Sequence, residues 1–319
     1  MSDMFRNCVA GCGVARMGSL SVFVLLLFCM AGCAGTSPVI LPANQAAALR
    51  HNQRGVKAEA TGDHAQALEE FSEALRLSRA IEHTEGIVVA LVNSSRVQRH
   101  NGDVNAALAL INRALPLVAP REPLYPEVAF EMAQVMVLAG ESGNALEWAA
   151  KSVDADAGDQ RGMRINLLAR ILYRNGTMAE AETRAREALL LNSQHGLRDE
   201  EANSLRLLGD LLTAEKRYGE AAESYNRALA IDKDRGASRK IAADMRGLAR
   251  LSLTQNDTGQ ALGFYQRACA VSSAGGDRSA AADDLLNMSG IHEKRGEKEL
   301  AERMLSERDR LLKKLPLSF

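Results

Sequence analysis

Aromatic residues and prolines are scarce in this chain. Aromatic residues make up 4% of the 319 residues, with a single Trp, and there are seven Pro. β-Sandwiches and β-barrels draw heavily on aromatic and β-branched side chains, so both folds are disfavoured. Hydrophobic residues at 46% and charged residues at 25% are average for a globular protein, which excludes wholesale disorder. The abundance of Ala, Leu, Arg and Glu favours an all-α fold.

An excess of charge of either sign is also absent. The chain has 39 Lys and Arg against 40 Asp and Glu, which gives a formal net charge of −1. Proteins that bind nucleic acid by general electrostatic attraction carry a clear positive excess. We therefore expect no nucleic-acid partner.

The apolar run near the N-terminus is too short to span a membrane. It extends for 11 residues, from Leu20 to Met30, whereas a spanning helix needs about 17–25 residues. Arg6 and Arg16 precede this run and small residues follow it, an order typical of a secretory signal peptide. We expect residues 1–32 to be removed as a signal peptide.

The last residues of this segment, Met30-Ala-Gly-Cys33, resemble the lipobox of bacterial lipoproteins. In that family the Cys is diacylated and becomes the new N-terminus, so the resemblance implies lipidation of Cys33, with palmitate-type chains as a membrane anchor. Residues 33–45 would then form a flexible tether. Because residue 34 is Ala and not Asp, the resemblance implies a place in the Gram-negative outer membrane, facing the periplasm. Ordinary cleavage after Ala34, without lipid, is the alternative.

Cysteine becomes scarce once this cleavage is taken into account. Of the five Cys, three precede Cys33, and Cys33 itself would carry lipid, so only Cys269 remains. No intrachain disulfide can then form, and the packing of the core alone must hold the fold together.

Signatures of catalysis and metal binding are absent as well. The chain contains no G-x-x-x-x-G-K-[ST], H-E-x-x-H or G-x-S-x-G motif, and no C-x-x-C pair follows residue 33. The six His are scattered without the spacing of metal ligands. We therefore expect no enzyme activity, no metal and no cofactor.

What the chain has instead is an internal repeat. A small residue recurs inside apolar segments every 36–40 residues, and a turn position lies five residues before it. Small residues at fixed steps let two helices pack closely, so each unit is expected to be a helical hairpin that stacks on the next. The recurring small residues are Ala67, Ala107, Ala145, Ala181, Ala221, Ala261 and Ala301, and the turn positions are Gly62, Gly102, Gly140, Gly176, Lys216, Asn256 and Gly296.

These units resemble the tetratricopeptide repeat. The clearest one, residues 205–228, contains Leu208-Gly209, Ala221 and the Tyr225-x-x-Ala228 signature. The resemblance covers residues 46–316 as about seven repeats and implies an α-solenoid of stacked antiparallel hairpins, although the units are longer than the family's usual roughly 34 residues. In the seventh unit Arg308 replaces a small residue, which indicates a solvent-facing cap.

Prolines cluster between the second and third repeats, at 116, 120, 123 and 126. Proline interrupts helices and holds the residue before it in extended geometry. We therefore expect a stiff extended connector over residues 116–126, with a bend or offset between the second and third repeats. A plain surface loop is the alternative.

The resemblance also implies which residues face the concave groove formed by the first helices. Carried over position by position, they are Arg96 and Arg99 in repeat two, Asn166, Arg170 and Tyr173 in repeat four, Arg206 and Asp210 in repeat five, and Arg246 and Arg250 in repeat six. Arginine suits carboxylates and Asn can hold a peptide backbone.

We call Arg170, Arg206, Arg246 and Arg250 the arginine strip, and expect it to bind an extended acidic segment or a free C-terminus of another protein. The alternative is that these arginines are solvated or paired with acids on neighbouring helices, such as Asp210 or Glu201.

The lipobox and the repeats together favour a non-enzymatic, outer-membrane-anchored periplasmic scaffold or adaptor that binds proteins or peptides. A pilotin-type assembly lipoprotein of a secretion or pilus system, and a regulator of cell-wall hydrolases, both stay open. A carrier of small ligands would need an apolar concave lining, against which the arginines argue. An enzyme hidden in loops would need longer loops than repeats of 36–40 residues leave.

Overall fold

The computed structural model describes residues 41–313. The predictions for the signal peptide, for lipidation of Cys33 and for most of the tether lie outside the described residues. The first described helix begins at Ala43, so residues 43–45, which were expected to belong to the flexible tether, are helical.

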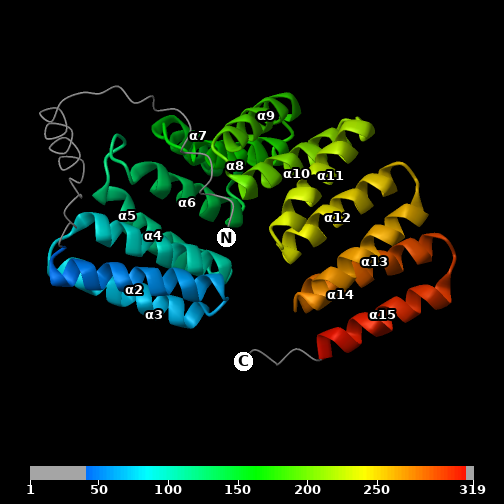
Figure 1. The fold of residues 1–319 in the computed structure, drawn as a ribbon, viewed down its shortest axis with the longest axis horizontal. Helices are drawn as coiled ribbons and strands as arrows, with labels where there is room; N and C mark the ends of the chain where they lie inside the picture. The colour runs from blue at the N-terminus through cyan, green and yellow to red at the C-terminus, as the bar shows by residue number, and fades with distance from the viewer. Residues whose placement is uncertain (1–40, 314–319) are drawn as a thin grey trace, which may run out of the picture. The chain divides into compact units, whose positions relative to one another are not determined.

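The described residues form fourteen α-helices and one short 3₁₀-helix, with no strand among them (Figure 1). The α-helices follow one another as seven hairpins, as the repeat predicts. In order these are α2 (Ala43–Ala60) with α3 (His64–Ala80), α4 (Thr84–His100) with α5 (Val104–Ala114), α6 (Tyr125–Leu138) with α7 (Ser142–Ala155), α8 (Arg161–Arg174) with α9 (Met178–Gln194), α10 (Arg198–Ala214) with α11 (Tyr218–Asp234), α12 (Ser238–Thr254) with α13 (Thr258–Ala274), and α14 (Arg278–Lys294) with α15 (Lys298–Lys313).

The chain reverses inside every hairpin at a residue with positive φ. All seven predicted turn positions adopt this left-handed conformation, including the two without glycine, Lys216 (φ 63°) and Asn256 (φ 61°). Such a residue ends the first helix by closing backbone hydrogen bonds onto its last turn. In three of the hairpins an Asp then caps the second helix: the side chains of Asp63, Asp103 and Asp257 accept hydrogen bonds from backbone N–H groups three residues on.

The recurring alanines are the contact points between helices. All seven are at most 2% exposed, which confirms their expected role. Packing is close around Tyr225 of α11, whose ring lies against Gly209 of α10 and Gly247 of α12. A Cβ atom at Gly247 would lie 2.3 Å from Cε1 of Tyr225, so only glycine fits between the two helices.

The proline-rich segment differs from the expected extended connector. Pro116 lies in the 3₁₀-helix η1 (Leu115–Leu117), which continues α5, and Pro126 lies in the first turn of α6. Proline is compatible with both places because the first turn of a helix needs no donor from it. Residues 118–124 between them form turns and bends, and Trp148 packs against the hydrophobic clusters on both sides of the segment. The bend between the repeats stays a prediction.

The first helices of successive hairpins also contact one another: α2 contacts α4, α4 contacts α6, α8 contacts α10, and α10 contacts α12. We call the side formed by these first helices the inner wall. At the C-terminal end, α15 buries only Ala301 among its residues, as expected of a cap.

Candidate functional site

The predicted groove residues all lie on first helices. Arg96 and Arg99 are on α4, Asn166, Arg170 and Tyr173 on α8, Arg206 and Asp210 on α10, and Arg246 and Arg250 on α12. Side chains three or four residues apart share one face of a helix, so each helix presents its candidates together. The structure nevertheless gives them different surroundings.

Two cavities open on the inner wall between α8, α10 and α12. The first has a volume of about 390 Å³ and is lined by Arg170, Tyr173, Arg174, Asn203, Arg206, Leu207 and Asp210. The second has a volume of about 510 Å³ and is lined by Tyr173, Asp210, Thr213, Ala214, Lys216, Tyr218, Tyr225, Arg250 and Thr254. Tyr173 and Asp210 line both cavities, so we treat the two as one site and call it the inner groove.

Two arginines of the strip are bound to buried acids of the next hairpin. Arg206 donates to Oδ1 of Asp244 at 2.6 Å and also pairs with Asp232. Arg246 donates to both carboxylate oxygens of Asp284, at 2.6 and 2.7 Å. All three carboxylates are fully buried. The alternative reading, pairing with acids on neighbouring helices, therefore describes Arg206 and Arg246, with partners that the sequence alone did not suggest.

The two arginines of α4 also pair with acids of the next hairpin. Arg96 donates to Glu127 at 2.6 Å, and Arg99 donates to the fully buried Glu131 at 3.0 Å. Burial raises the pKa of the Glu131 carboxyl, and the hydrogen bond from Arg99 opposes this effect. Neither arginine lines the inner groove.

Arg250 and Asp210 form the wall of the second cavity. Oδ1 of Asp210 accepts hydrogen bonds from the Tyr225 hydroxyl at 2.7 Å and from Arg250 at 2.8 Å. The Arg250 side chain is 51% exposed, so exchanging its contact with Asp210 for a contact with a ligand carboxylate costs little free energy. Burial, together with the nearby Asp210 carboxylate, raises the pKa of Tyr173, which keeps its hydroxyl protonated and able to donate.

Arg170 is the member of the strip that the fold leaves without a partner. Among the described residues, neither Arg170 nor Arg174, one turn further along α8, makes a hydrogen bond or ion pair. The surrounding protein removes water from the Arg170 guanidinium and thereby lowers its pKa, and the positive charges of Arg174 and Arg206 add to this effect. The first cavity thus carries positive charge that no protein carboxylate neutralises by direct contact.

Asn166 does not reach the groove. Its side chain is 2% exposed, and neither its amide nitrogen nor its amide oxygen has a hydrogen-bond partner. It lies at the joint between the fourth and fifth hairpins and lines neither cavity.

The sequence reading missed Arg174, Asn203 and Tyr218, which line the inner groove. The signal for Arg174 was available, because it lies four residues after Arg170 and therefore on the same helix face. The same signal was available for Asn203, which lies three residues before Arg206 on α10. Tyr218 carries no comparable signal, because it begins a second helix and its place depends on how neighbouring hairpins are stacked.

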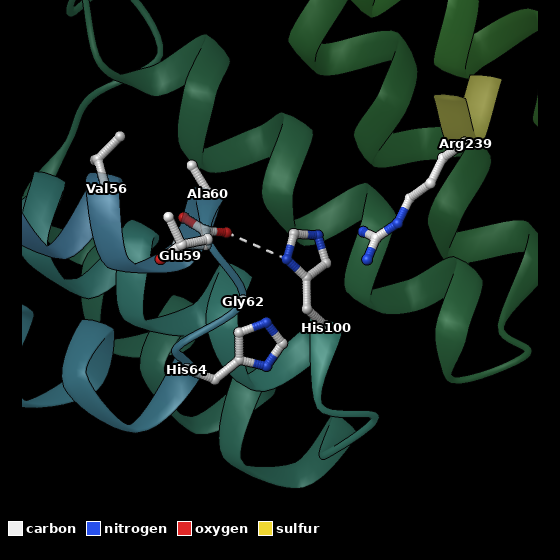
Figure 2. Close-up of a pocket in the computed structure, with 8 residues that line it drawn as sticks. Val56, Glu59, Ala60, Gly62, His64, His100 and Arg239 are labelled. Atoms are coloured by element: carbon white, nitrogen blue, oxygen red, sulfur yellow. Dashed lines mark ion pairs between the residues drawn. The ribbon is translucent and has the colours of Figure 1, made fainter. Parts of the chain in front are cut away.

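A third cavity, of about 820 Å³, lies apart from all the predicted residues. It is lined by Val56, Glu59, Ala60, Thr61, Gly62, His64, His100 and Arg239. Figure 2 shows Glu59 paired with His100, with Nδ1 of the imidazole 3.2 Å from the carboxylate, and Arg239 on the opposite side. Burial lowers the pKa of His100, and the charges of Arg99 and Arg96 act in the same direction.

Within residues 41–313 no cluster of three or more His, Cys, Asp or Glu is arranged to hold a metal ion. Over the same range, every helix is too short or too polar to cross a membrane.

The comparisons with known proteins bear on the hairpins that form the inner groove. Residues 163–234, which span α8 to α11, match the tetratricopeptide repeat family. A search of the curated proteins finds no significant match.

Among solved structures, a Rap protein in complex with competence and sporulation factor superposes with a TM-score of 0.65 at 12% identity, over 83% of this chain and 76% of that one. Apo RapI gives a TM-score of 0.62 at 14% identity, over 84% and 99% of the two chains. The pilF protein of Pseudomonas aeruginosa gives 0.53 at 15% identity, over 71% and 92%.

The chain folds as a tetratricopeptide-repeat α-solenoid. Identities this low show the fold alone. Solenoids of this kind typically act as scaffolds for protein–protein interaction without catalysing a reaction.

Proposed function

We propose that this protein is an outer-membrane-anchored periplasmic adaptor that binds a protein partner through the inner groove. The observation that carries the groove proposal is the pair Arg170 and Arg174, which line one cavity without a carboxylate partner. A folded protein gains no stability from two like charges held together in partly desolvated positions. A ligand carboxylate would supply the missing counter-charge.

The chemistry of the groove favours an extended acidic segment or a free C-terminus as the bound element. Arg170 and Arg174 present planar guanidinium forks, which bind carboxylates through charge-assisted hydrogen bonds. Asn203 and Tyr173, beside them in the cavity wall, supply polar groups for a peptide backbone. A small apolar ligand finds no comparable fit, because charged and polar side chains dominate the lining.

The arginine strip therefore divides into two parts in this proposal. Arg170, with Arg174, and the partly exposed Arg250 serve binding. Arg206 and Arg246 serve the joints between hairpins, because both are bound to fully buried carboxylates.

The groove proposal is tested by photo-cross-linking in the periplasm. A photoreactive amino acid at Tyr173, in the inner groove, is expected to capture a specific partner. The same amino acid at Leu190, a 58% exposed position on α9 of the same hairpin, is expected to capture none. Capture of the same species at both positions would mean that the inner groove is not the binding surface.

The anchor proposal rests on the lipobox-like sequence Met30 to Cys33. Replacing Cys33 by Ser removes the thiol that accepts the lipid, so we expect unprocessed precursor to accumulate in the inner membrane. Fractionation of the envelope with mass spectrometry of the N-terminus measures this. A Cys33→Ser protein that is cleaved and released into the periplasm would contradict the anchor.

A further inference from the structure

Three polar positions recur at the joints between successive hairpins, displaced by one repeat of 40 residues. One comes from the first helix of a hairpin, one from the end of its second helix, and one from the first helix of the next hairpin. At the joint between hairpins four and five they are Asn166, Asn192 and Ser204; between five and six Arg206, Asp232 and Asp244; and between six and seven Arg246, Ser272 and Asp284.

The joint between hairpins six and seven is balanced in charge. Arg246 donates to both oxygens of Asp284, at 2.6 and 2.7 Å, and to the hydroxyl of Ser272 at 2.7 Å. One buried carboxylate thus meets one guanidinium, and each oxygen of the carboxylate has a donor.

The joint between hairpins five and six has two carboxylates for one guanidinium. Among the described residues, Arg206 is the single cation that pairs with Asp232 and Asp244, two fully buried carboxylates. It supplies a donor to one oxygen of each, at 2.5 and 2.6 Å. The remaining oxygens, Oδ1 of Asp232 and Oδ2 of Asp244, are buried and have no donor.

Keeping two carboxylates ionised in one buried site costs free energy, because their negative charges repel each other. A proton shared between them removes this repulsion. The proton would also complete the hydrogen bonding, because a carboxyl O–H on one Asp can donate to the orphaned oxygen of the other. We propose that Asp232 and Asp244 hold one proton between them at neutral pH, so that the joint between hairpins five and six is a proton-binding site that weakens when the proton leaves to water.

Charged side chains near this joint, among the residues that the structure describes, contact other groups. On α10 Glu201 is paired with Arg198, on α12 Lys240 is paired with Asp199 and Arg246 with Asp284, and the sole charged residue of α13, Arg267, lies over the ring of Phe264. From α8, Arg170 acts on Arg206 but contacts neither carboxylate.

The electrostatics agree with the geometry. Burial raises the pKa of Asp244 to about 7; Arg206 opposes the rise, and the neighbouring Asp232 adds to it. A folded-state pKa above the unfolded value of about 3.9 means that the folded chain binds the proton more tightly. The stabilisation is therefore complete below about pH 4 and is lost as the pH rises through about 7.

The next repeat provides a control for this proposal, because Ser272 occupies the position in the sixth hairpin that Asp232 occupies in the fifth. Asp232→Ser copies the balanced joint into the fifth hairpin, and Ser272→Asp copies the second acid into the sixth. Asp234→Ser removes an exposed acid from the same helix, α11, as a matched control.

The measurement is the urea midpoint of the full chain at a series of pH values from about 5 to about 8. The wild-type midpoint is expected to fall as the pH rises. The fall should be shallower in Asp232→Ser, steeper in Ser272→Asp and unchanged in Asp234→Ser. Unchanged slopes in Asp232→Ser and Ser272→Asp would overturn the proposal.

Infrared spectroscopy gives a readout independent of unfolding. At neutral pH the wild-type protein is expected to show the C=O stretch of a protonated carboxylic acid, and Asp232→Ser to lack it. If Asp232→Ser does not fold, a second such band in Ser272→Asp supports the proposal. Absence of the band from the wild-type protein would refute it. This inference does not depend on the proposed partner.

Discussion

Replacing Arg206 by Gln is expected to lower the free energy of unfolding by about 3–5 kcal/mol above neutral pH, because it leaves buried carboxylates without their cation. Asp232 and Asp244 are both fully buried, and within residues 41–313 Arg206 is the one cation that pairs with them. Gln keeps some of the volume of Arg and can donate hydrogen bonds, so the loss reports mainly on charge. Chemical denaturation of the purified protein measures it.

Arg250→Gln is the matched control. Its partner Asp210 is 30% exposed, and the Arg250 side chain is 51% exposed, so water can replace the lost contact. We expect a loss of less than about 1 kcal/mol. Equal losses in the two variants would mean that the buried acids do not depend on Arg206.

The contrast between these variants separates the structural arginines from the binding ones. Arg206 and Arg246 connect successive hairpins through buried acids, whereas Arg170 and Arg174 have no hydrogen-bond or ion-pair partner in the part of the chain that the structure describes. Residues whose conformation or charge destabilises the folded protein are often functional, because binding a ligand offsets the lost stability.

The regular part of the fold follows from local rules and was therefore predictable from the sequence. A hairpin needs a small residue where its helices touch and a left-handed residue where it turns. Both conditions are visible at fixed spacing, so even Lys216 and Asn256 could be assigned to turns without glycine. The proline-rich segment was less predictable, because Pro126 is as compatible with the start of a helix as with a connector.

The division of the arginine strip could not be predicted in the same way. The first-helix positions show that Arg206 and Arg246 face the inner wall, but their partners Asp244 and Asp284 lie 38 residues further along. Which acid an arginine reaches depends on how the next hairpin is stacked.

Reversing the charge of the groove is expected to abolish partner binding while the fold persists. In Arg170→Glu/Arg174→Glu the first cavity presents carboxylates to a ligand that we expect to be acidic. Losing two charge-assisted hydrogen bonds of about 1.5 kcal/mol each corresponds to roughly a hundredfold weaker Kd. Helicity and the urea midpoint should change little, because neither arginine has a partner among the described residues.

The matched control is Arg113→Glu/Arg227→Glu, which changes the net charge equally at two exposed arginines on the second helices α5 and α11. It separates contact in the groove from general electrostatic attraction, which both double variants reduce to the same extent.

The most direct test of the account is the affinity of the groove for the partner segment that cross-links to position 173, measured as a synthetic peptide by fluorescence anisotropy at two salt concentrations. We predict binding to the wild-type protein that weakens as salt rises, roughly a hundredfold loss in Arg170→Glu/Arg174→Glu, and a near wild-type Kd in Arg113→Glu/Arg227→Glu. Equal Kd values for the wild-type protein and the groove variant would contradict the claim that the unpaired arginines of α8 hold the partner.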